Sequence, residues 1–280
     1  MPDQNSPEPE RDLRSAGIDI TRPHPARTWD YYLGGKDNFA ADRAAADQVI
    51  AAWPGMRVSA RENRKFIGRA VQYLAGEAGI DQFLDIGSGL PTASNVHEVA
   101  QAINPAARVV YVDNDPLVLV HARALLTSSP EGKCAYIQAD LRQPETILNA
   151  PATRATLDFN RPIALILAAV VHFLLPEDEP AGIIKTLVDA LPSGSYVAAS
   201  HGSTEYGTQE EADVVIRLIH ASGVRIATRD STDFANLVFN GLTLVPPGVV
   251  LMSEWRPSPT GGPRPGAREV GVNAGVARKP

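Results

Sequence analysis

Apolar and polar residues alternate along the middle of the chain in a pattern that predicts strands and helices in turn. Short apolar runs typical of buried strands occupy 82–86, 108–112, 135–139, 163–171 and 195–200. Apolar residues at helical spacing predict helices at 59–76, 178–191 and 210–222, and others that begin at Asn95 and Pro116. The pattern therefore predicts an α/β domain built on a parallel sheet.

The last part of the chain departs from this alternation. Two apolar segments, 242–245 and 249–255, flank Pro246-Pro247-Gly248 and predict an antiparallel β-hairpin. We expect residues 1–24, rich in charge and proline, to form a flexible arm, and residues 258–280 to form a flexible tail. Between them we expect a helical extension or lid at 25–80 and one α/β domain at 81–257.

Composition and charge exclude several classes of protein. The 280 residues carry a net charge of −6, which gives no general attraction for nucleic acid or an anionic membrane. A single cysteine excludes an intramolecular disulfide, and the six histidines lack the spacing of a metal site, so we expect no metal. The longest apolar run, 162–176, is too short to span a bilayer, and the N-terminus lacks a signal-peptide pattern. We expect a cytoplasmic protein with no nucleic-acid or membrane partner, and the sequence carries no sign of its oligomeric state.

The most informative motif is a glycine turn directly after the first strand. The run Asp85-Ile86-Gly87-Ser88-Gly89 lets the backbone approach a ligand, and the second strand ends in Asp113, whose carboxylate can accept hydrogen bonds from two ribose hydroxyls. A dinucleotide site prefers a third glycine, which this turn lacks. The Asp-x-Gly-x-Gly form is instead typical of sites for S-adenosylmethionine (SAM).

With these residues the chain resembles a family of actinobacterial SAM-dependent methyltransferase-like proteins, long catalogued as a domain of unknown function. The motifs that carry the resemblance lie at 27–39, 61–66, 82–92, 110–116 and 247–250. The resemblance implies a Rossmann-like SAM-methyltransferase fold with a seven-stranded, mostly parallel sheet, a C-terminal antiparallel hairpin and an N-terminal helical extension. It implies SAM as the cofactor and S-adenosylhomocysteine (SAH) as its product, and it names no methyl acceptor.

Ligands of such sheets bind outside the carboxyl ends of the parallel strands, and this places the candidate cofactor residues. We expect the glycine turn to line the methionine portion, Asp113 to bind the ribose, and Asn114, Asp140 and Leu141 to contact the adenine. A helix-capping role for Asp113 and a simple turn at Asp140 are the alternatives. The complete set is Asn63, Arg64, Asp85, Gly87, Ser88, Gly89, Asp113, Asn114, Asp140, Leu141 and Ala168.

Arg64, on the helix at 59–76, is the candidate for binding the cofactor carboxylate, because a guanidinium forms two parallel hydrogen bonds with a carboxylate. Asn63 can share this role. The alternative is a surface arginine. For catalysis we single out His172 and His201, which follow the fourth and fifth strands, and Tyr32 in the extension. The alternatives are histidines that only bind backbone and a tyrosine that anchors the extension.

Three functions compete. The leading one is a SAM-dependent methyltransferase that acts on a small molecule. The second is a SAM- or SAH-binding protein without transfer activity. It remains open because Ala168-Ala169-Val170-Val171-His172-Phe173 stands where adenine methyltransferases carry Asn-Pro-Pro-Tyr, an absence that also argues against DNA adenine methylation. The third, a nicotinamide-dependent oxidoreductase, would need the missing glycine.

Overall fold

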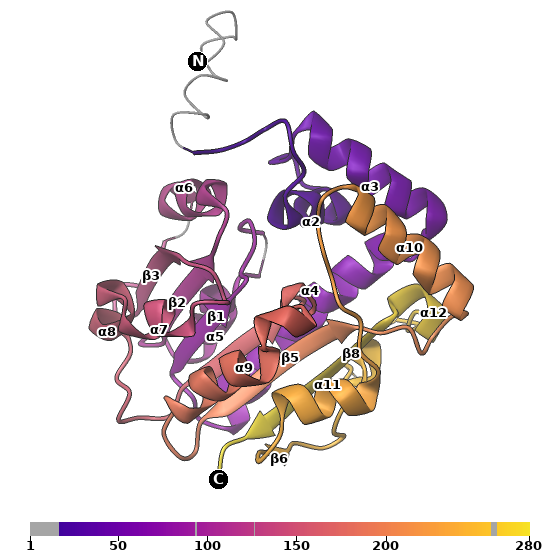
Figure 1. Cartoon of the computed structure of the whole chain (residues 1–280). Coiled ribbons are helices and arrows are strands. Elements are labelled where there is room, and N and C mark those ends of the chain that lie inside the picture. Colours follow the sequence, from indigo (N-terminus) through magenta and orange to yellow (C-terminus); the bar gives the residue numbers. More distant parts are fainter. Residues whose placement is uncertain (1–16, 93, 126, 259–261) are drawn as a thin grey trace, which may run out of the picture.

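The computed structural model describes residues 17–92, 94–125, 127–258 and 262–280. Within these ranges a mixed sheet of eight strands, in the order β3-β2-β1-β4-β5-β8-β6 with β7 also paired to β8, forms the centre of the protein (Figure 1). The strands are β1 Gln82–Ile86, β2 Arg108–Asp113, β3 Lys133–Gln138, β4 Ala164–Ala168, β5 Tyr196–Gly202, β6 Thr243–Leu244, β7 Val250–Leu251 and β8 Val272–Arg278.

The first five strands are parallel, as predicted. In the middle of the sheet, Leu84 of β1 lies opposite Val110 of β2 on one side and Leu165 of β4 on the other. All three side chains are fully buried and belong to one apolar cluster, because side chains in register on parallel strands point to the same face. Parallel alignment brings the carboxyl ends of β1 to β4 to one edge of the sheet.

The C-terminal part of the sheet is antiparallel. It includes residues that were predicted to form a flexible tail. Strand β8 pairs with β5 along its whole length, from Tyr196 opposite Arg278 to Gly202 opposite Val272. The segments predicted to form the hairpin, β6 and β7, each pair with a different end of β8. They form one edge of the sheet, interrupted between Leu244 and Val250. The sheet therefore has eight strands rather than the seven predicted, and the predicted architecture is otherwise confirmed. The expectation of a flexible tail is wrong for the described residues 262–280.

Helices cover both faces of the sheet and create two apolar clusters. On one face α4 and α5 pack against alternate strand residues, and on the other face α7, α9 and α11 do the same. The helices are α2 Pro25–Leu33, α3 Ala40–Ala52, α4 Met56–Gln72, α5 Val96–Ile103, α6 Pro116–Leu125, α7 Pro144–Asn149, α8 Pro151–Thr156, α9 Pro180–Asp189, α10 Gln209–Ala221, α11 Ser231–Val238 and α12 Ala267–Val270. A π-helical turn, Tyr73–Glu77, continues α4, and short 3-10 turns lie at Val171–Phe173, Pro176–Asp178 and Met252–Glu254.

The N-terminal extension packs against the rest of the protein. Helices α2 and α3 contact each other, α2 contacts α4, and α3 lies against α10 from the far end of the chain (Figure 1). Of the predicted flexible arm, residues 1–16 lie outside the described ranges. The expectation is wrong for residues 17–24, because Ile18 is buried against Leu90 and Leu117. None of the described helices is long and apolar enough to cross a membrane.

Candidate functional site

A cavity of about 580 Å³ lies at the carboxyl ends of the parallel strands. We call it the first cavity. Its walls are the segments that follow β1, β2, β3 and β4, together with parts of α2 and α4. All eleven predicted cofactor-binding residues line it: Asn63, Arg64, Asp85, Gly87, Ser88, Gly89, Asp113, Asn114, Asp140, Leu141 and Ala168. Residues that are up to 105 positions apart in the sequence, from Asn63 to Ala168, therefore meet at one site.

The glycine turn follows β1 in a conformation that requires glycine. Gly87 has a φ of 75° and Gly89 a φ of 67°. A Cβ atom on Gly87 would lie 2.5 Å from Cγ2 of Val170, whereas one on Gly89 would meet open space. The first glycine is therefore required both by its backbone angle and by its neighbour, and the second opens the turn to the cavity.

Asp113 joins the glycine turn to the end of β2. One carboxylate oxygen, Oδ2, accepts a hydrogen bond of 2.8 Å from the backbone N–H of Gly89, and the other accepts one of 3.0 Å from that of Asp115. Burial raises the pKa of Asp113, and these two bonds oppose the rise. Each oxygen keeps a lone pair, so the carboxylate can accept two further hydrogen bonds.

Asp85, which is buried, and Arg64, which is half-buried, lie together in the lining of the first cavity. Burial raises the pKa of Asp85 to about 7, and Arg64 counteracts that rise. Burial likewise lowers the pKa of Arg64, against the influence of Asp85. Among the described residues, Nε of Arg64 has no hydrogen-bond partner, and Nη2 makes only a long bond of 3.4 Å to the carbonyl oxygen of Ser94. Arg64 is thus a half-buried cation with donors left for an anion, and it is not the fully exposed arginine of the alternative interpretation.

Asp140 is held by its neighbour Arg142. The guanidinium donates from Nε and Nη2 to the two carboxylate oxygens, each at 3.0 Å, and the backbone N–H of Arg142 adds a bond of 2.9 Å. Burial alone would raise the pKa of Asp140, but these bonds hold it below its usual range. Asp140 therefore does form the turn that was the alternative to a role in binding adenine. This turn lies at the wall of the first cavity, beside the buried Leu141.

A chain of hydrogen bonds orients the amide of Asn63. The N–H of Ala169 donates to Oγ of Ser200 at 2.9 Å, and that hydroxyl donates to Oδ1 of Asn63 at 2.6 Å. With Oδ1 used as an acceptor, the NH₂ group of Asn63 is left as a donor on the cavity wall, and no residue of the described chain accepts from it. Ala169 has a φ of 53°, a left-handed conformation that is costly for a residue with a Cβ and is concentrated at functional sites.

The predicted catalytic residues fall outside the first cavity. His172 and Tyr32 line a second cavity, of about 320 Å³. Burial, assisted by Arg229, lowers the pKa of His172 to about 4, and burial raises the pKa of Tyr32. His201 lines neither cavity: it is buried with its ring against Phe234, and Nε2 lies 3.2 Å from Nη1 of Arg229. His172 and Tyr32 therefore share the lining of the second cavity, whereas His201 lies behind this lining with its ring stacked on that of His172, the ring centroids 5.9 Å apart.

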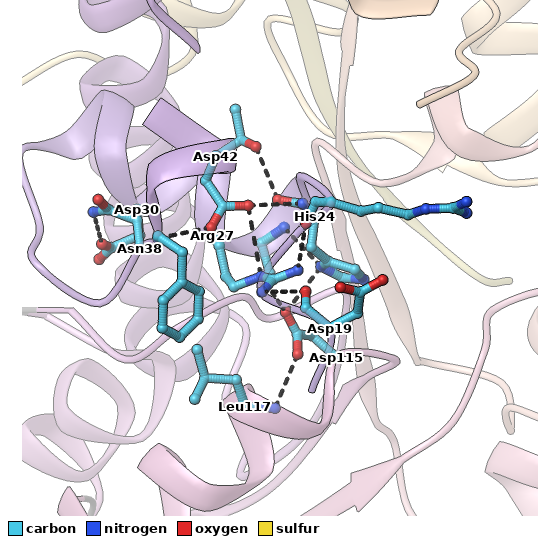
Figure 2. A network of polar contacts seen from close by, with 12 residues as sticks. Asp19, His24, Arg27, Asp30, Asn38, Asp42, Asp115 and Leu117 are labelled. Carbon is cyan, nitrogen blue, oxygen red and sulfur yellow. Dashed lines mark hydrogen bonds and ion pairs between the residues drawn. The ribbon is translucent and has the colours of Figure 1, made fainter. Parts of the chain in front are cut away.

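Sequence reasoning missed a buried ionic network that fastens the N-terminal extension to the site. Figure 2 shows Arg27 between Asp42 and Asp115, with its Nε 3.6 Å from Oδ1 of Asp42 and 3.2 Å from Oδ2 of Asp115. His24 places Nδ1 3.0 Å from the same oxygen of Asp115. Asp115 follows Asp113 by two residues, so the network attaches α2 to the loop after β2. In the sequence, Asp115 and Pro116 together indicate the start of α6. This pattern predicts a helix cap and does not predict an ionic network.

Comparisons with solved structures place this geometry among known proteins. A DUF574 family protein from Streptomyces avermitilis is 45% identical, with a TM-score of 0.88 over 94% of this chain and 100% of its own. A protein from Thermobifida fusca, described provisionally as a methyltransferase, is 44% identical, with a TM-score of 0.86 over 94% of this chain and 97% of its own.

A third solved structure, a SAM-dependent methyltransferase from Anabaena variabilis, is 13% identical. Its TM-score is 0.50 over 94% of this chain and 98% of its own, and it shows a likeness of fold alone. A search of curated proteins found no match. The family model described as S-adenosyl methyltransferase matches residues 11–280. The chain therefore belongs to the S-adenosyl methyltransferase family, with SAM as its cofactor.

Proposed function

We propose that the chain transfers the methyl group of SAM to a small-molecule acceptor, with SAM in the first cavity. When bound, SAM supplies an electrophilic methyl group on a sulfonium: the lone pair of an acceptor atom forms a bond to the methyl carbon, the electrons of the carbon–sulfur bond remain on sulfur to give SAH, and the acceptor releases its proton. The observation that carries the proposal is the lining of the first cavity, where all eleven residues expected to bind SAM converge.

The charged groups of that lining match the charges of the cofactor. Arg64, half-buried with an unpartnered Nε, suits a carboxylate, and the NH₂ group of Asn63 can donate to the same group. We assign Asp85 to the cofactor's ammonium group, because a nearby cation favours the ionised form of a carboxyl. The two free lone pairs of Asp113 suit the ribose hydroxyls. Asn114, Asp140 and Leu141 are left for the adenine.

A small acceptor is favoured by what adjoins the first cavity. The second cavity lies beside it and is enclosed by helices of the N-terminal extension and by α10. His172, on the wall of that cavity, is neutral near pH 7 and offers a ring nitrogen that can accept a proton or orient a hydroxyl. Tyr32 is placed as a packing or positioning residue, because burial keeps its hydroxyl protonated. His201, which lines neither cavity and stacks on His172, is given no direct role in the transfer.

Calorimetric titration of the purified protein with SAH tests the proposal. We expect binding by the wild type and an affinity at least tenfold lower for Asp113→Ala, because two charge-assisted hydrogen bonds to the ribose are lost. Asp189→Ala is the matched control: Asp189 is exposed at the end of α9, and its removal should leave the affinity unchanged. Equal affinity of the wild type and Asp113→Ala would mean that the ribose lies elsewhere.

The transfer itself needs a separate readout. Tritium from the methyl group of labelled SAM should appear in an acceptor drawn from a collection of small molecules. SAH binding without transfer to any member of the collection would favour the alternative, a protein that binds the cofactor without using it.

A further inference from the structure

The second cavity adjoins the first and shares part of its lining. Six residues line both cavities and form the border between them: Pro25, Trp29, Asn63, Ala169, Phe173 and Val224. This border contains the two features that already mark a functional position, the oriented amide of Asn63 and the left-handed Ala169. A molecule in the second cavity would therefore reach the contents of the first cavity only across this wall.

The walls of the second cavity are mainly apolar and come from outside the sheet. Helix α10 contributes Val215, Ile216 and Ile219, and α3 contributes Val49, which belongs to the buried cluster against which Val215 and Ile219 pack. Helix α10 has no fully buried residue, although it carries this apolar stripe. An amphipathic helix ordinarily buries its apolar face against the core. Here part of that face borders an open cavity, so a ligand would complete its burial.

The two cavities differ in the charge of the side chains that line them. The first has ionisable side chains on its walls, among them the buried Asp85 and the half-buried Arg64 and Asp113. In the second cavity, the charged residues of the described lining are Glu211 and Arg268. They neutralise each other, because Nη2 of Arg268 lies 2.6 Å and 2.7 Å from the two carboxylate oxygens of Glu211, and both side chains are exposed at the rim.

The inner part of the described lining of the second cavity has no charged side chain: Arg229, whose charge acts on His172, does not line the cavity and donates to the carbonyl oxygen of Leu174 at 2.9 Å. His172 is unprotonated near neutral pH, since burial lowers its pKa to about 4. The other polar groups are hydroxyls such as those of Thr28, Ser59 and Thr228, which can orient a neutral polar atom. An ionised ligand would lose its hydration there without a partner of opposite charge, and this is strongly unfavourable.

We infer that the second cavity is the acceptor site and selects an uncharged, largely apolar molecule, whose one nucleophilic polar group lies at the wall formed by Asn63 and Ala169. This inference rests on the proposed function. The volume of about 320 Å³ is within the range of cavities that bind small organic molecules. The apolar stripe of α10 and Val49 contacts the body of the molecule, and the hydroxyls together with His172 orient its reacting atom.

Two related compounds test the charge selection by direct binding to the protein saturated with SAH. The first is 2-naphthol, a neutral apolar molecule with one hydroxyl, and the second is 6-hydroxy-2-naphthoate, which adds a carboxylate to the same rings. Calorimetry should show saturable binding of 2-naphthol and binding of the carboxylate at least tenfold weaker. No binding of 2-naphthol, or equal binding of the two compounds, would overturn the inference.

A pair of variants on α10 locates the binding. Ala212 lines the second cavity, and Ala212→Phe should fill part of it and weaken 2-naphthol at least tenfold. Ala221 is exposed at the end of the same helix, and Ala221→Phe should leave binding unchanged. Equal loss in both variants, or in neither, would place 2-naphthol elsewhere. Unchanged SAH affinity in Ala212→Phe confirms that this variant is folded.

The failure of this inference and the failure of the proposed function give different results. If SAH does not bind the wild type, the proposed function fails, and the naphthol titrations can still be made on the free protein. If SAH binds and 2-naphthol does not respond to Ala212→Phe, the proposed function stands and the acceptor class is wrong.

Discussion

The hydroxyl of Ser200 at the end of β5 donates a 2.6 Å hydrogen bond to Oδ1 of Asn63 in α4, 137 residues away in the sequence. The same hydroxyl accepts from the N–H of Ala169, so one serine links three elements that meet at the border of the two cavities. Because Ser200 and Asn63 are both buried, their hydrogen bond fixes which side of the amide faces the ligand.

Ser200→Ala should therefore weaken SAH as well as destabilise the protein. Loss of the hydroxyl frees the amide of Asn63 to rotate, and we expect a roughly threefold to tenfold loss of SAH affinity and a stability loss of about 1–2 kcal/mol. Ser195→Ala is the matched control, since Ser195 is also buried and accepts a bond of 3.0 Å from the N–H of Ile163, far from the cavities. It should cost similar stability in urea unfolding and leave the calorimetric affinity unchanged. Equal affinity losses in the two variants would show that Ser200 acts only on the fold.

Asp85 should make the stability of the free protein depend on pH. Its pKa is raised to about 7 by burial, so between its ordinary value of 3.8 and about 7 the folded state holds a proton that the unfolded state has released. The free energy of unfolding therefore falls as pH rises through this window and levels off above it. Asp85→Asn removes this contribution, so the variant should gain in thermal stability relative to the wild type as pH increases from about 4 to about 7.

The same substitution should weaken the cofactor. A carboxylate binds the ammonium group of SAH and a neutral amide does not, so the affinity of the wild type should rise between about pH 6 and about pH 8, whereas that of Asp85→Asn should be lower and flatter. Asp81→Asn, just before β1, is the control and should change neither property. A wild-type affinity that is constant over this range would mean that the ligand does not contact Asp85.

Arg27 should be required to hold the N-terminal extension over the first cavity. Its side chain is 4% exposed and lies between the buried Asp42 and Asp115. Arg27→Leu removes the cation between the two buried carboxylates and leaves Asp115 with His24 alone as an ionic partner. Loss of one partner costs about 3–5 kcal/mol in comparable networks, and it should lower SAH affinity by releasing α2. Arg161→Leu breaks the more exposed pair with Asp81 and should cost less than about 1 kcal/mol. Similar unfolding midpoints in urea for both variants would show that the network does not stabilise the extension.

The first cavity could be predicted from the sequence because its residues lie in short motifs at strand ends. Gly87 and Asp113 are recognised from their local spacing, and parallel strands then bring them together regardless of the rest of the chain. The network around Arg27 was not predictable in this way. Its partners Asp42 and Asp115 lie on separate helices or loops, and the sequence does not indicate which distant acids will be buried together.

The second cavity was also beyond sequence reasoning, for a different reason. The apolar stripe of α10, which includes Ala212, Val215 and Ile219, has the spacing typical of a helix that packs on a core. Only the arrangement of α10 against α3 shows that part of this stripe borders open space. His172 was predicted to lie near the site and does line this cavity, whereas His201, also a predicted catalytic residue, is buried against Phe234 and His172.

Strand β8 was missed because its sequence lacks the usual signs of a strand. It is rich in small residues, and a Cβ on Gly275 would lie 3.1 Å from Cγ2 of Val249 and 3.2 Å from the ring of Phe239, so a side chain there would require both neighbours to shift. Such a requirement depends on neighbours that are distant in the sequence.

The position of β8 predicts a large difference between two substitutions in one strand. Val276 is fully buried and lies opposite Ala198 of β5, whereas Arg278 at the end of the strand is exposed. Val276→Asp buries a carboxyl without a partner, and we expect a loss of about 3–5 kcal/mol in urea unfolding. Arg278→Asp introduces the same residue at the surface and should cost less than about 1 kcal/mol. If the two variants were equally stable, the segment would not be part of the folded sheet, and the flexible tail expected from the sequence would be correct.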